Sequence, residues 1–477
     1  MWWIYPLIVL GIIDIIVLVR TMRFKKKHTV NDKIWHDVDQ NHAVQSLSDM
    51  LKIKTVSYSD PVLEDSKSFI AFRDYIQNRY PQIMKVATYE VIERGMLFKI
   101  PGKASDQPIV LMSHYDVVPA QDGWKDNPFS GKITDTHIYG RGALDTKSSL
   151  NAIMEAMEHL LTLNKLFSQD IYLAFSGDEE IFGNSAPSIV KTLKERGIKP
   201  YLVLDEGGAI VSKMFPGVRE KAAVVGIAEK GFMNVRLTAT SRGGHASTPP
   251  KDTPLTELSK AVVRLNNHPS FSLKMTEPVK ALFDTLAPYS KSFGIRMLFS
   301  NLWLFMPLIK VIAKLSGGEF LSMFKTTQAF TIAKGSDAIN VLPSEASMSI
   351  NYRLRPGETS SIILDRISHI IKNPHITIEA LAISEATSTS LVDEAFNKVK
   401  HAISQTWPHV LVAPYLMVAT TDSRHYHEIC DHVYKFSPMD VSKEDLKKIH
   451  GYDEDISIDN VVHGVNFYIC LLNQFVV

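Results

Sequence analysis

The stretch QPIVLMSHYD, residues 107–116, decides the fold because an almost continuous apolar run ends in a histidine and an aspartate. Such a run is typical of a strand that is buried within a sheet. Further along the chain, the pattern predicts a helix at 148–163, a strand at 169–177, a helix at 186–197 and a strand at 200–208. Strands that alternate with helices predict a largely parallel sheet with both faces covered, and hence an α/β domain.

Upstream, the spacing of apolar residues predicts a helix at 42–56 and strands at 85–93 and 95–102. A different rhythm begins near residue 229. We expect a strand, a helix, two strands, a helix and a strand at 231–240, 253–267, 327–335, 345–356, 359–372 and 376–384. This βαββαβ order is that of a ferredoxin-like unit, so a second α+β domain at 229–385 is expected to interrupt the first.

The chain is then expected to return to the α/β domain through a helix at 392–403, a strand at 414–419 and a helix at 459–475. Between the first helix and the second strand of the inserted unit lies the apolar stretch 292–317. It could pass for a second membrane segment, but Arg296, Lys310 and Lys314 make insertion costly. We expect a packed helical insert that lines an apolar groove or leans on a membrane surface.

The N-terminus predicts a membrane anchor at 2–21 and a basic tether at 22–40. Residues 2–19 are almost continuously apolar and long enough as a helix to cross a bilayer core. Arg20, Arg23 and the lysines at 25–27 follow the run, whereas a cleaved signal peptide carries its positive cluster in front. By the positive-inside rule, the body of the protein is expected on the cytoplasmic side of a single-pass anchor.

The composition excludes several classes of partner. The 477 residues include 52 basic and 51 acidic side chains, a net charge of +1, so no electrostatic field favours nucleic acid. Cys430 and Cys470 are too few for a disulfide framework and are expected to be buried as small apolar residues.

Acidic and histidine residues follow three of the predicted strands. His114 and Asp116 follow the first, Glu179 and Glu180 the second, and Asp205 ends the third, while Asp145 lies in the glycine-rich loop 138–147. Taken singly, these residues are typical of capped or solvated turns. Together, at the carboxyl ends of strands in one sheet, they predict a crevice with nitrogen and oxygen ligands for zinc, manganese or cobalt. Asp116 can fix the imidazole tautomer of His114.

Nine ordered motifs then carry a resemblance that covers residues 44–477. They are SHYDVVPA (113–120), GRGALDTKSS (140–149), SGDEEIFG (176–183), LDEGG (204–208), AEKGFMNV (228–235), RGGHASTPP (242–250), NVLPSEASMSINYRLRPG (340–357), TDSRHY (421–426) and HGYDEDI (450–456). The chain resembles the dinuclear zinc aminoacylase/carboxypeptidase metallopeptidase family, which includes acetylornithine deacetylases and succinyl-diaminopimelate desuccinylases. Within that family it looks most like the carboxypeptidase S and N-acyl amino acid hydrolase branch.

The resemblance implies a zinc-exopeptidase-like mixed sheet with two divalent ions, zinc first and cobalt or manganese as alternatives. It implies metal ligation by five residues, with Asp145 bridging the ions: His114, Asp145, Glu180, Asp205 and His450. It assigns Glu179 as general base, His245 as the group that stabilises the oxyanion, in cis or across a dimer, and Arg353, Asn340 and Arg424 as substrate carboxylate ligands. The parts 41–228 and 386–477 are then the catalytic domain and 229–385 a lid and dimerisation domain.

Two histidines compete for the last ligand position. His450 lies in HGYDEDI, which is similar to the family's His-Gly-x-Asn-Glu pattern, whereas His463 lies in the last predicted helix and is expected to be a packing or capping residue. The chain departs from the family at Asp453, where Asn is usual, and at Ala419 and Thr420, where relatives often have Gly-Asn. Neither departure touches an expected ligand, although the second can alter substrate fit.

We therefore expect a membrane-anchored metal-dependent amidohydrolase or exopeptidase that acts on a small peptide or N-acyl amino acid with a free carboxylate. One alternative keeps this site but takes long-chain N-acyl amino acids, in the hydrolytic or the reverse direction. The other is a catalytically silent, membrane-tethered binding module, which predicts lost ligands or a missing base. All five expected ligands and Glu179 are present, so the enzyme is favoured.

Overall fold

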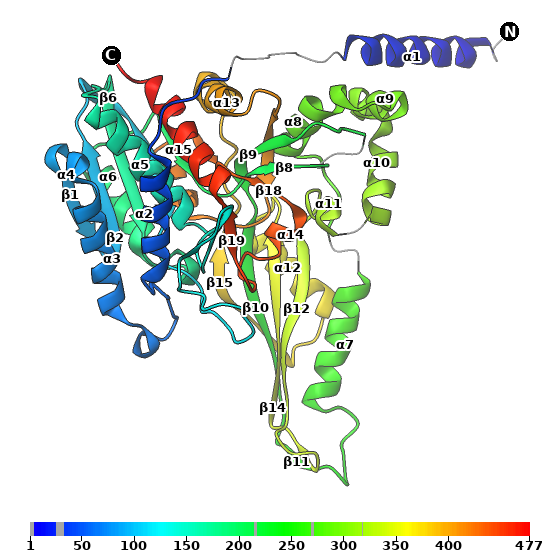
Figure 1. Ribbon diagram of the computed structural model, residues 1–477. Helices are drawn as coiled ribbons and strands as arrows, with labels where there is room; N and C mark the ends of the chain where they lie inside the picture. The colour runs from blue at the N-terminus through cyan, green and yellow to red at the C-terminus, as the bar shows by residue number, and fades with distance from the viewer. Residues whose placement is uncertain (1–3, 25–32, 214–216, 269–270, 317) are drawn as a thin grey trace.

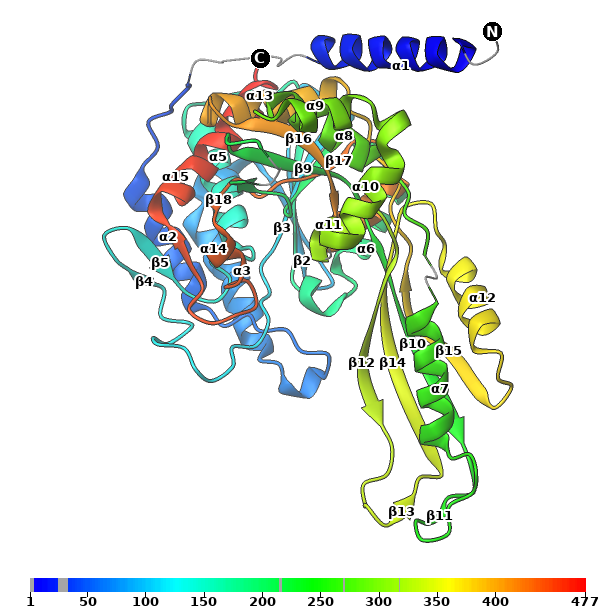
Figure 2. The same ribbon diagram turned by 90° about the vertical axis from the view of Figure 1, so that its right-hand side faces the viewer.

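The computed structural model describes residues 4–24, 33–213, 217–268, 271–316 and 318–477. Residues 2 and 3 of the predicted anchor, the lysines at 25–27 and the tether residues up to 32 lie outside the described part of the chain. Two sheets dominate the architecture, a broad central sheet and a narrow sheet that extends away from it (Figures 1 and 2). The sequence-predicted α/β class is therefore correct, and the central sheet is mixed rather than purely parallel.

The central sheet has the order β1-β2-β6-β3-β7-β17-β9-β8-β18, with β16 paired to β9. The first five strands in this order span Thr88–Ile92, Gly95–Ile100, Gln169–Ser176, Ala104–His114 and Leu202–Asp205. The others span Val433–Lys435, Ala222–Glu229, Ile210–Val211, Asp440–Val441 and, for β16, Leu411–Met417. Strands β6, β3, β7 and β17 are parallel neighbours, whereas β1, β2 and β6 pair antiparallel.

Helices cover both faces of this sheet because successive side chains of each strand point to opposite sides. On β3, Leu111 packs in one core with helices α2 (Gln40–Lys52), α5 (Lys147–Thr162), α13 (Glu394–Thr406) and α15 (Ile458–Asn473). Val110 faces the other side and packs with α6 (Ser185–Glu195) and η4 (Asp422–Glu428). Helices α3 (Ser66–Arg79) and α4 (Pro81–Val86) complete the first core. Cys430 and Cys470 are buried and free, as predicted.

The narrow sheet has the order β12-β14-β10-β15 and is antiparallel throughout. Its strands span Thr327–Lys334, Glu345–Leu354, Gly231–Thr240 and Ile376–Ser384. Helices α7 (Pro254–Asn267) and α12 (Ser360–Ile371) pack on it through Leu258, Leu265 and Ile367. Along the chain the elements follow the βαββαβ order expected from the sequence. A short two-stranded ribbon forms the far tip of the narrow sheet and pairs β11 (Gly244–His245) with β13 (Val341–Leu342) (Figure 2).

The apolar insert does not pack on the narrow sheet. Helices α8 (Glu277–Leu286), α9 (Phe293–Ser300), α10 (Leu302–Ser316) and α11 (Gly318–Ser322) form a separate core with β9 and β16 of the central sheet. Val224, Phe283 and Leu416 lie in that core. The segment 229–385 thus packs partly on the narrow sheet and partly on the central sheet, because the apolar outer face of β9 and β16 is buried by the insert.

Helix α1 (Ile4–Arg23) lies beside α9 at one end of the molecule (Figure 1). It is long and apolar enough to cross a membrane and is almost entirely exposed. Its length and composition are those of a membrane anchor or a signal sequence.

Candidate metal centre

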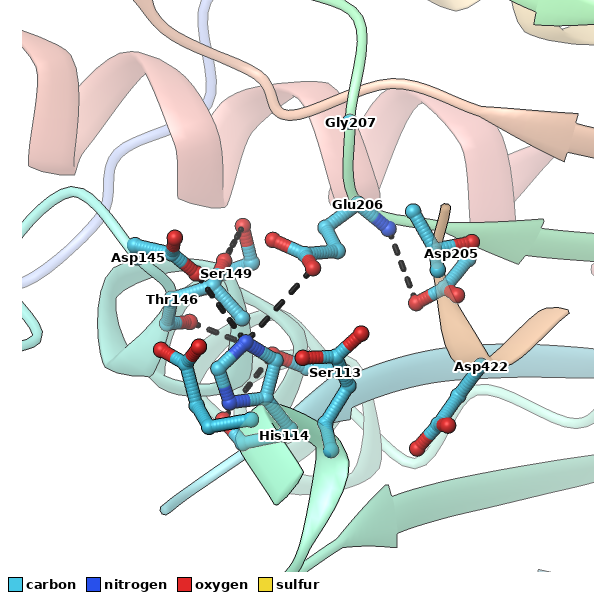
Figure 3. A network of polar contacts seen from close by, with 12 residues as sticks. Ser113, His114, Asp145, Thr146, Ser149, Asp205, Glu206, Gly207 and Asp422 are labelled. Atoms are coloured by element: carbon cyan, nitrogen blue, oxygen red, sulfur yellow. Dashed lines mark hydrogen bonds and ion pairs between the residues drawn. The ribbon is translucent and has the colours of Figure 1, made fainter. Parts of the chain in front are cut away.

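The residues predicted to follow the parallel strands lie at one edge of the central sheet. Strands β3, β6 and β7 run parallel, with His114 opposite Ser176 and Leu111 opposite Leu204. Their carboxyl ends therefore open on one crevice, as expected for an open α/β sheet. Figure 3 shows His114, Asp145 and Glu206 converging there.

Asp145 lies between two imidazole rings. Its Oδ1 is 3.0 Å from Nε2 of His114, and its Oδ2 is 3.2 Å from Nε2 of His450. Nε2 of His450 is also 3.1 Å from the Glu180 carboxylate. Ligand atoms of His114, Asp145 and Glu180 all lie within 4.8 Å of one another. One carboxylate that faces two imidazoles with separate oxygens is an arrangement that can bridge a pair of divalent cations.

The tautomer of His114 is set by a main-chain carbonyl group two residues further along the chain. Nδ1 of His114 is 3.0 Å from the main-chain carbonyl oxygen of Asp116. A carbonyl oxygen can only accept a hydrogen bond, so Nδ1 donates and Nε2 keeps its lone pair for a metal. The sequence predicts this role for the Asp116 carboxylate. In the structure its Oδ1 lies 3.4 Å from Nδ1 of His114, and the carboxylate also accepts from the backbone N–H groups of Glu179 and Glu180, each at 3.1 Å.

The turn SGDEEIFG gives its three acids separate environments. The Asp178 carboxylate accepts from the backbone N–H groups of Asn184 and Ser185 at the start of α6, a structural role. Glu179 and Glu180 begin the short helix η2 (Glu179–Ile181), whose backbone is held by Asp116. Glu180 faces His450, whereas the ionisable neighbours of Glu179 are His114, Asp422, Glu206 and Glu180.

Glu206 is a site residue that the sequence reasoning missed. Its Oε1 lies 3.5 Å from Nε2 of His114. The neighbouring carboxylate of Asp205 makes no contact with His114 among the described residues, and its oxygens accept from the backbone N–H groups of Glu206 and Ser423, both at 2.9 Å (Figure 3). Either acid of the pair Asp205-Glu206 in LDEGG could be the ligand. Adjacent residues at a strand end face opposite sides, so the alternation along the strand was the signal that could have distinguished them.

The crevice concentrates buried negative charge. Burial raises the pKa of Glu179 well above its ordinary value, and burial together with the nearby Asp145 raises the pKa of Glu206 to about 7. Hydrogen bonds to Asp145 and Glu180 raise the pKa of His450 to about 10. The raised pKa values of the carboxylates and of the imidazole have one cause, namely that several carboxylates share a buried space. The donor set therefore fits divalent cations.

A buried ion pair holds the loop that carries Asp145. Glu454 is fully buried and accepts from Nη1 of Arg141 at 2.9 Å. It also accepts from the backbone N–H groups of Gly142, Leu144 and Asp145, at 3.1, 2.7 and 3.2 Å. Strand β19 (Asp455–Ser457) then pairs with β5 (His137–Tyr139), which in turn pairs with β4 (Lys132–Ile133). The motif that supplies His450 thus also fixes Asp145.

We predict that Glu454→Ala lowers the free energy of unfolding by about 3–5 kcal/mol, because it leaves Arg141 buried without its partner. Urea unfolding of the metal-free protein, followed by circular dichroism, measures this loss. The matched control is Asp453→Asn. That side chain accepts from the backbone N–H of Lys125 near the surface, and the change should stay within about 0.5 kcal/mol. An unchanged midpoint for Glu454→Ala would contradict the proposed support of the loop.

His463 does not approach the centre. Its ring lies against Trp35 and Trp407, with centroids 5.0 and 5.5 Å away, and Nδ1 contacts the carbonyl oxygen of Asp459. The expectation of a packing residue is confirmed. His450, the histidine chosen from the sequence, has a left-handed backbone with φ of 58°, a conformation that is costly outside glycine and concentrated at functional sites.

Two of the predicted substrate ligands meet on a pair of aromatic rings. The Arg424 guanidinium lies 5.5 Å from the ring of Phe182, and the Arg353 guanidinium lies 6.0 Å from the ring of Phe232. The two phenylalanine rings are 4.9 Å apart. Phe182 follows Glu180 by two residues and Phe232 is the second residue of β10, so this cluster joins the turn SGDEEIFG to the narrow sheet. Within the described part of the chain, the Arg353 guanidinium has no hydrogen bond or ion pair.

The other two predicted residues lie elsewhere. His245 is at the exposed tip of the narrow sheet, where its Nδ1 is 2.7 Å from Oγ of Ser247. Asn340 lies beside it, and its carbonyl oxygen accepts from the N–H of Ala246. The tip is remote from the strand ends that carry His114 (Figures 1 and 2). Within one chain the structure does not bring His245 or Asn340 to the metal centre.

Comparison with known proteins identifies the family. The model described as peptidase family M20/M25/M40 matches residues 110–474. The chain belongs to this family. It is 35% identical to "Probable carboxypeptidase S-like 2" of Dictyostelium discoideum, over 98% of this chain and 92% of that protein. It is 33% identical to "N-fatty-acyl-amino acid synthase/hydrolase PM20D1" of Xenopus tropicalis, over 91% of this chain and 86% of that protein.

The M20/M25/M40 fold extends to solved structures. The metallo-carboxypeptidase Sso-CP2 of Sulfolobus solfataricus superposes with a TM-score of 0.66 at 18% identity, over 91% of this chain and 99% of that one. Family membership makes the protein a hydrolase of peptide or other amide bonds, and the resemblance drawn from the nine motifs is correct.

Proposed function

We propose that this chain is a two-metal amidohydrolase that cleaves the amide bond of a small peptide or N-acyl amino acid with a free carboxylate. The observation that carries the proposal is the position of Asp145 between His114 and His450. Glu206 adds a carboxylate on the His114 side and Glu180 one on the His450 side. These residues would hold two divalent ions, with zinc the first candidate for a nitrogen and oxygen donor set.

Bound there, two divalent ions would polarise the scissile carbonyl group and make a water molecule more acidic. Glu179 would take the proton of that water and return it to the leaving amine. In support, its backbone N–H donates to Asp116 and its carboxylate has His114 and Glu206 as ionisable neighbours. Asp116 also fixes His114 through its carbonyl oxygen. On this view Asp116 is a positioning residue, and Asp205 supports Glu206 through the backbone.

The substrate carboxylate would bind to Arg353, with Arg424 on the other side of the Phe182 and Phe232 rings. Among the described residues the Arg353 guanidinium has no hydrogen-bond or ion-pair partner, so its planar fork can bind a carboxylate without breaking an existing ion pair. The rings would then line the space for the substrate side chain or acyl group.

The narrow sheet would act as a lid over this crevice. His245 and Asn340 lie too far out to serve the metal centre of their own chain, which supports a homodimer in which the tip of one lid reaches the partner subunit's site. There His245 would donate to the developing oxyanion. Measurement of the molar mass in solution, followed by complementation between Glu179→Gln and His245→Ala chains, would test this arrangement: regain of activity on mixing requires action across subunits.

A substrate series tests the function as a whole. Metal-loaded protein is assayed with N-acetyl amino acids, long-chain N-acyl amino acids and dipeptides, and again after dialysis against a chelator. Chelator-sensitive hydrolysis of at least one class is expected. The long-chain class is favoured by the apolar surface of α1 and α10 and by the similarity to PM20D1, whereas a silent binding module would hydrolyse none.

We predict that Arg353→Ala raises the KM for a carboxylate substrate by about tenfold to a hundredfold. A hydrogen bond to a charged group contributes about 1.5–3 kcal/mol, and this one forms in the ground state as well as the transition state. Steady-state kinetics measure the change. The control is the same substrate with its carboxylate replaced by a primary amide, for which wild type and variant should have similar KM values. An unchanged KM for the carboxylate substrate would move the binding role to Arg424.

A further inference from the structure

Helix α10 exposes an apolar stripe that no described part of the chain covers. Its side chains Leu304, Leu308, Val311 and Leu315 are 37, 47, 51 and 83% exposed and recur at helical spacing. The opposite face carries Ile309 and Ala313, which are buried in the core with β9 and β16. A helix that is apolar all round is typical of a buried or a membrane environment, and half of this one is not buried in protein.

The flank of the stripe has the chemistry of a membrane interface. Trp303 is 53% exposed at the start of the helix. Lys310 and Lys314 are one turn apart on the same flank and have no ion pair within the described residues. Tryptophan and lysine beside an apolar face are the residues that settle at the boundary between lipid headgroups and acyl chains. The pair α9 and α10, bent by 114°, is also apolar enough for a membrane span by composition.

The stripe lies next to the helix that is itself a candidate membrane span. Asn301, fully buried at the junction of α9 and α10, donates from Nδ2 to Oγ1 of Thr21 at 3.2 Å. Ser300 contacts Thr21 as well, with 3.1 Å between the hydroxyl oxygens, and its carbonyl oxygen accepts from Nε of Arg20 at 3.2 Å. These polar contacts clamp the C-terminal end of α1 to the insert, so α1 is docked on the body.

We propose that the apolar stripe of α10 is a bilayer-docking surface, which enters the headgroup region beside α1. If α1 spans the membrane, Thr21 and Arg20 mark its boundary, because the basic residues follow the apolar run. The clamp then places the start of α10 at the same depth. Since α8–α11 pack on β9 and β16, the surface would fix the central sheet relative to the lipid.

Site-directed fluorescence on the full-length chain tests the proposal. Single cysteines are introduced as Leu308→Cys and Leu315→Cys and labelled with an environment-sensitive dye, and the protein is reconstituted into vesicles of phosphatidylcholine and phosphatidylserine. Cys430 and Cys470 are buried, so labelling is confined to the introduced thiols, which unlabelled wild type verifies. Ile339→Cys, fully exposed in the loop before β13, is the control in water. Ile15→Cys, 62% exposed on α1, is the control in lipid.

The expected result is a blue shift of emission at 308 and 315, quenching by shallow lipid-borne quenchers, and several-fold weaker quenching by aqueous iodide than at 339. Labels at 308 and 315 that behave like the label at 339, while the label at 15 is in lipid, would overturn the proposal and leave the anchor intact. Protection from iodide without lipid quenching would also overturn it, since a second protein chain would then cover the stripe. If the label at 15 is also in water, α1 is no anchor and the proposal fails with it. Thermal melting confirms that each variant is folded.

Discussion

Replacement of Glu179 by Gln is expected to lower kcat by about a hundredfold to ten-thousandfold while two metal ions per chain remain bound. Gln has the shape of Glu but cannot accept a proton at neutral pH. Among the described residues, no hydrogen bond or ion pair joins the Glu179 side chain to His114 or His450, the two imidazoles on either side of Asp145. Metal binding should therefore persist in the variant. Stopped-time assays of amide hydrolysis and elemental analysis of the dialysed protein measure the two quantities.

The next residue supplies the matched control for that experiment. Glu180→Gln changes the same chemical group one position along, but this carboxylate contacts His450 at 3.1 Å. It should lose metal as well as turnover. Full activity in Glu179→Gln would remove Glu179 from the role of base, and loss of metal in both variants would make Glu179 a ligand.

Glu206→Gln is expected to remove one of the two ions, whereas Asp205→Asn should retain both. Glu206 approaches His114, and the Asp205 oxygens are occupied by backbone N–H groups. Loss of a supporting residue typically reduces metal affinity or activity by about tenfold to a hundredfold. Titration of the metal-free variants with Zn²⁺ or Co²⁺ gives stoichiometry and affinity. The reverse pattern would return the ligand role to Asp205, which the sequence resemblance suggests.

The elements of the two sheets were largely predictable because each apolar run ended at a strong local signal. The strand predicted at 169–177 is β6 at Gln169–Ser176, and those predicted at 231–240 and 376–384 match β10 and β15. The predicted helix at 42–56 ends earlier, at Lys52 in α2. Strand β17 was missed although it joins β7 to β9, because three residues, Val433–Lys435, are too short to show a period.

At the site, residues were predictable where position along a strand decides direction, and less so where side chains choose between neighbours. His114 and Glu180 could be predicted because each lies where a buried strand ends. Asp205 and Glu206 differ only in the face on which each leaves β7. One of the donors that hold the Asp205 carboxylate is the backbone N–H of Ser423, far along the chain, which no local pattern shows. The packing of α8–α11 on β9 and β16 could not be predicted from local sequence either, because the apolar pattern of a helix does not indicate which surface it covers.

The metal centre is assembled from distant parts of the chain. Glu180 meets His450 across 270 residues, and Arg141 meets Glu454 across 313. During synthesis, the acids of the first half emerge long before the loop 450–454 that completes the crevice. Contacts of such separation form late, because closing the intervening chain costs entropy before any contact repays it. We therefore expect the nascent chain to be inactive until its C-terminal segment has been added, so that a truncated chain would not act as a hydrolase.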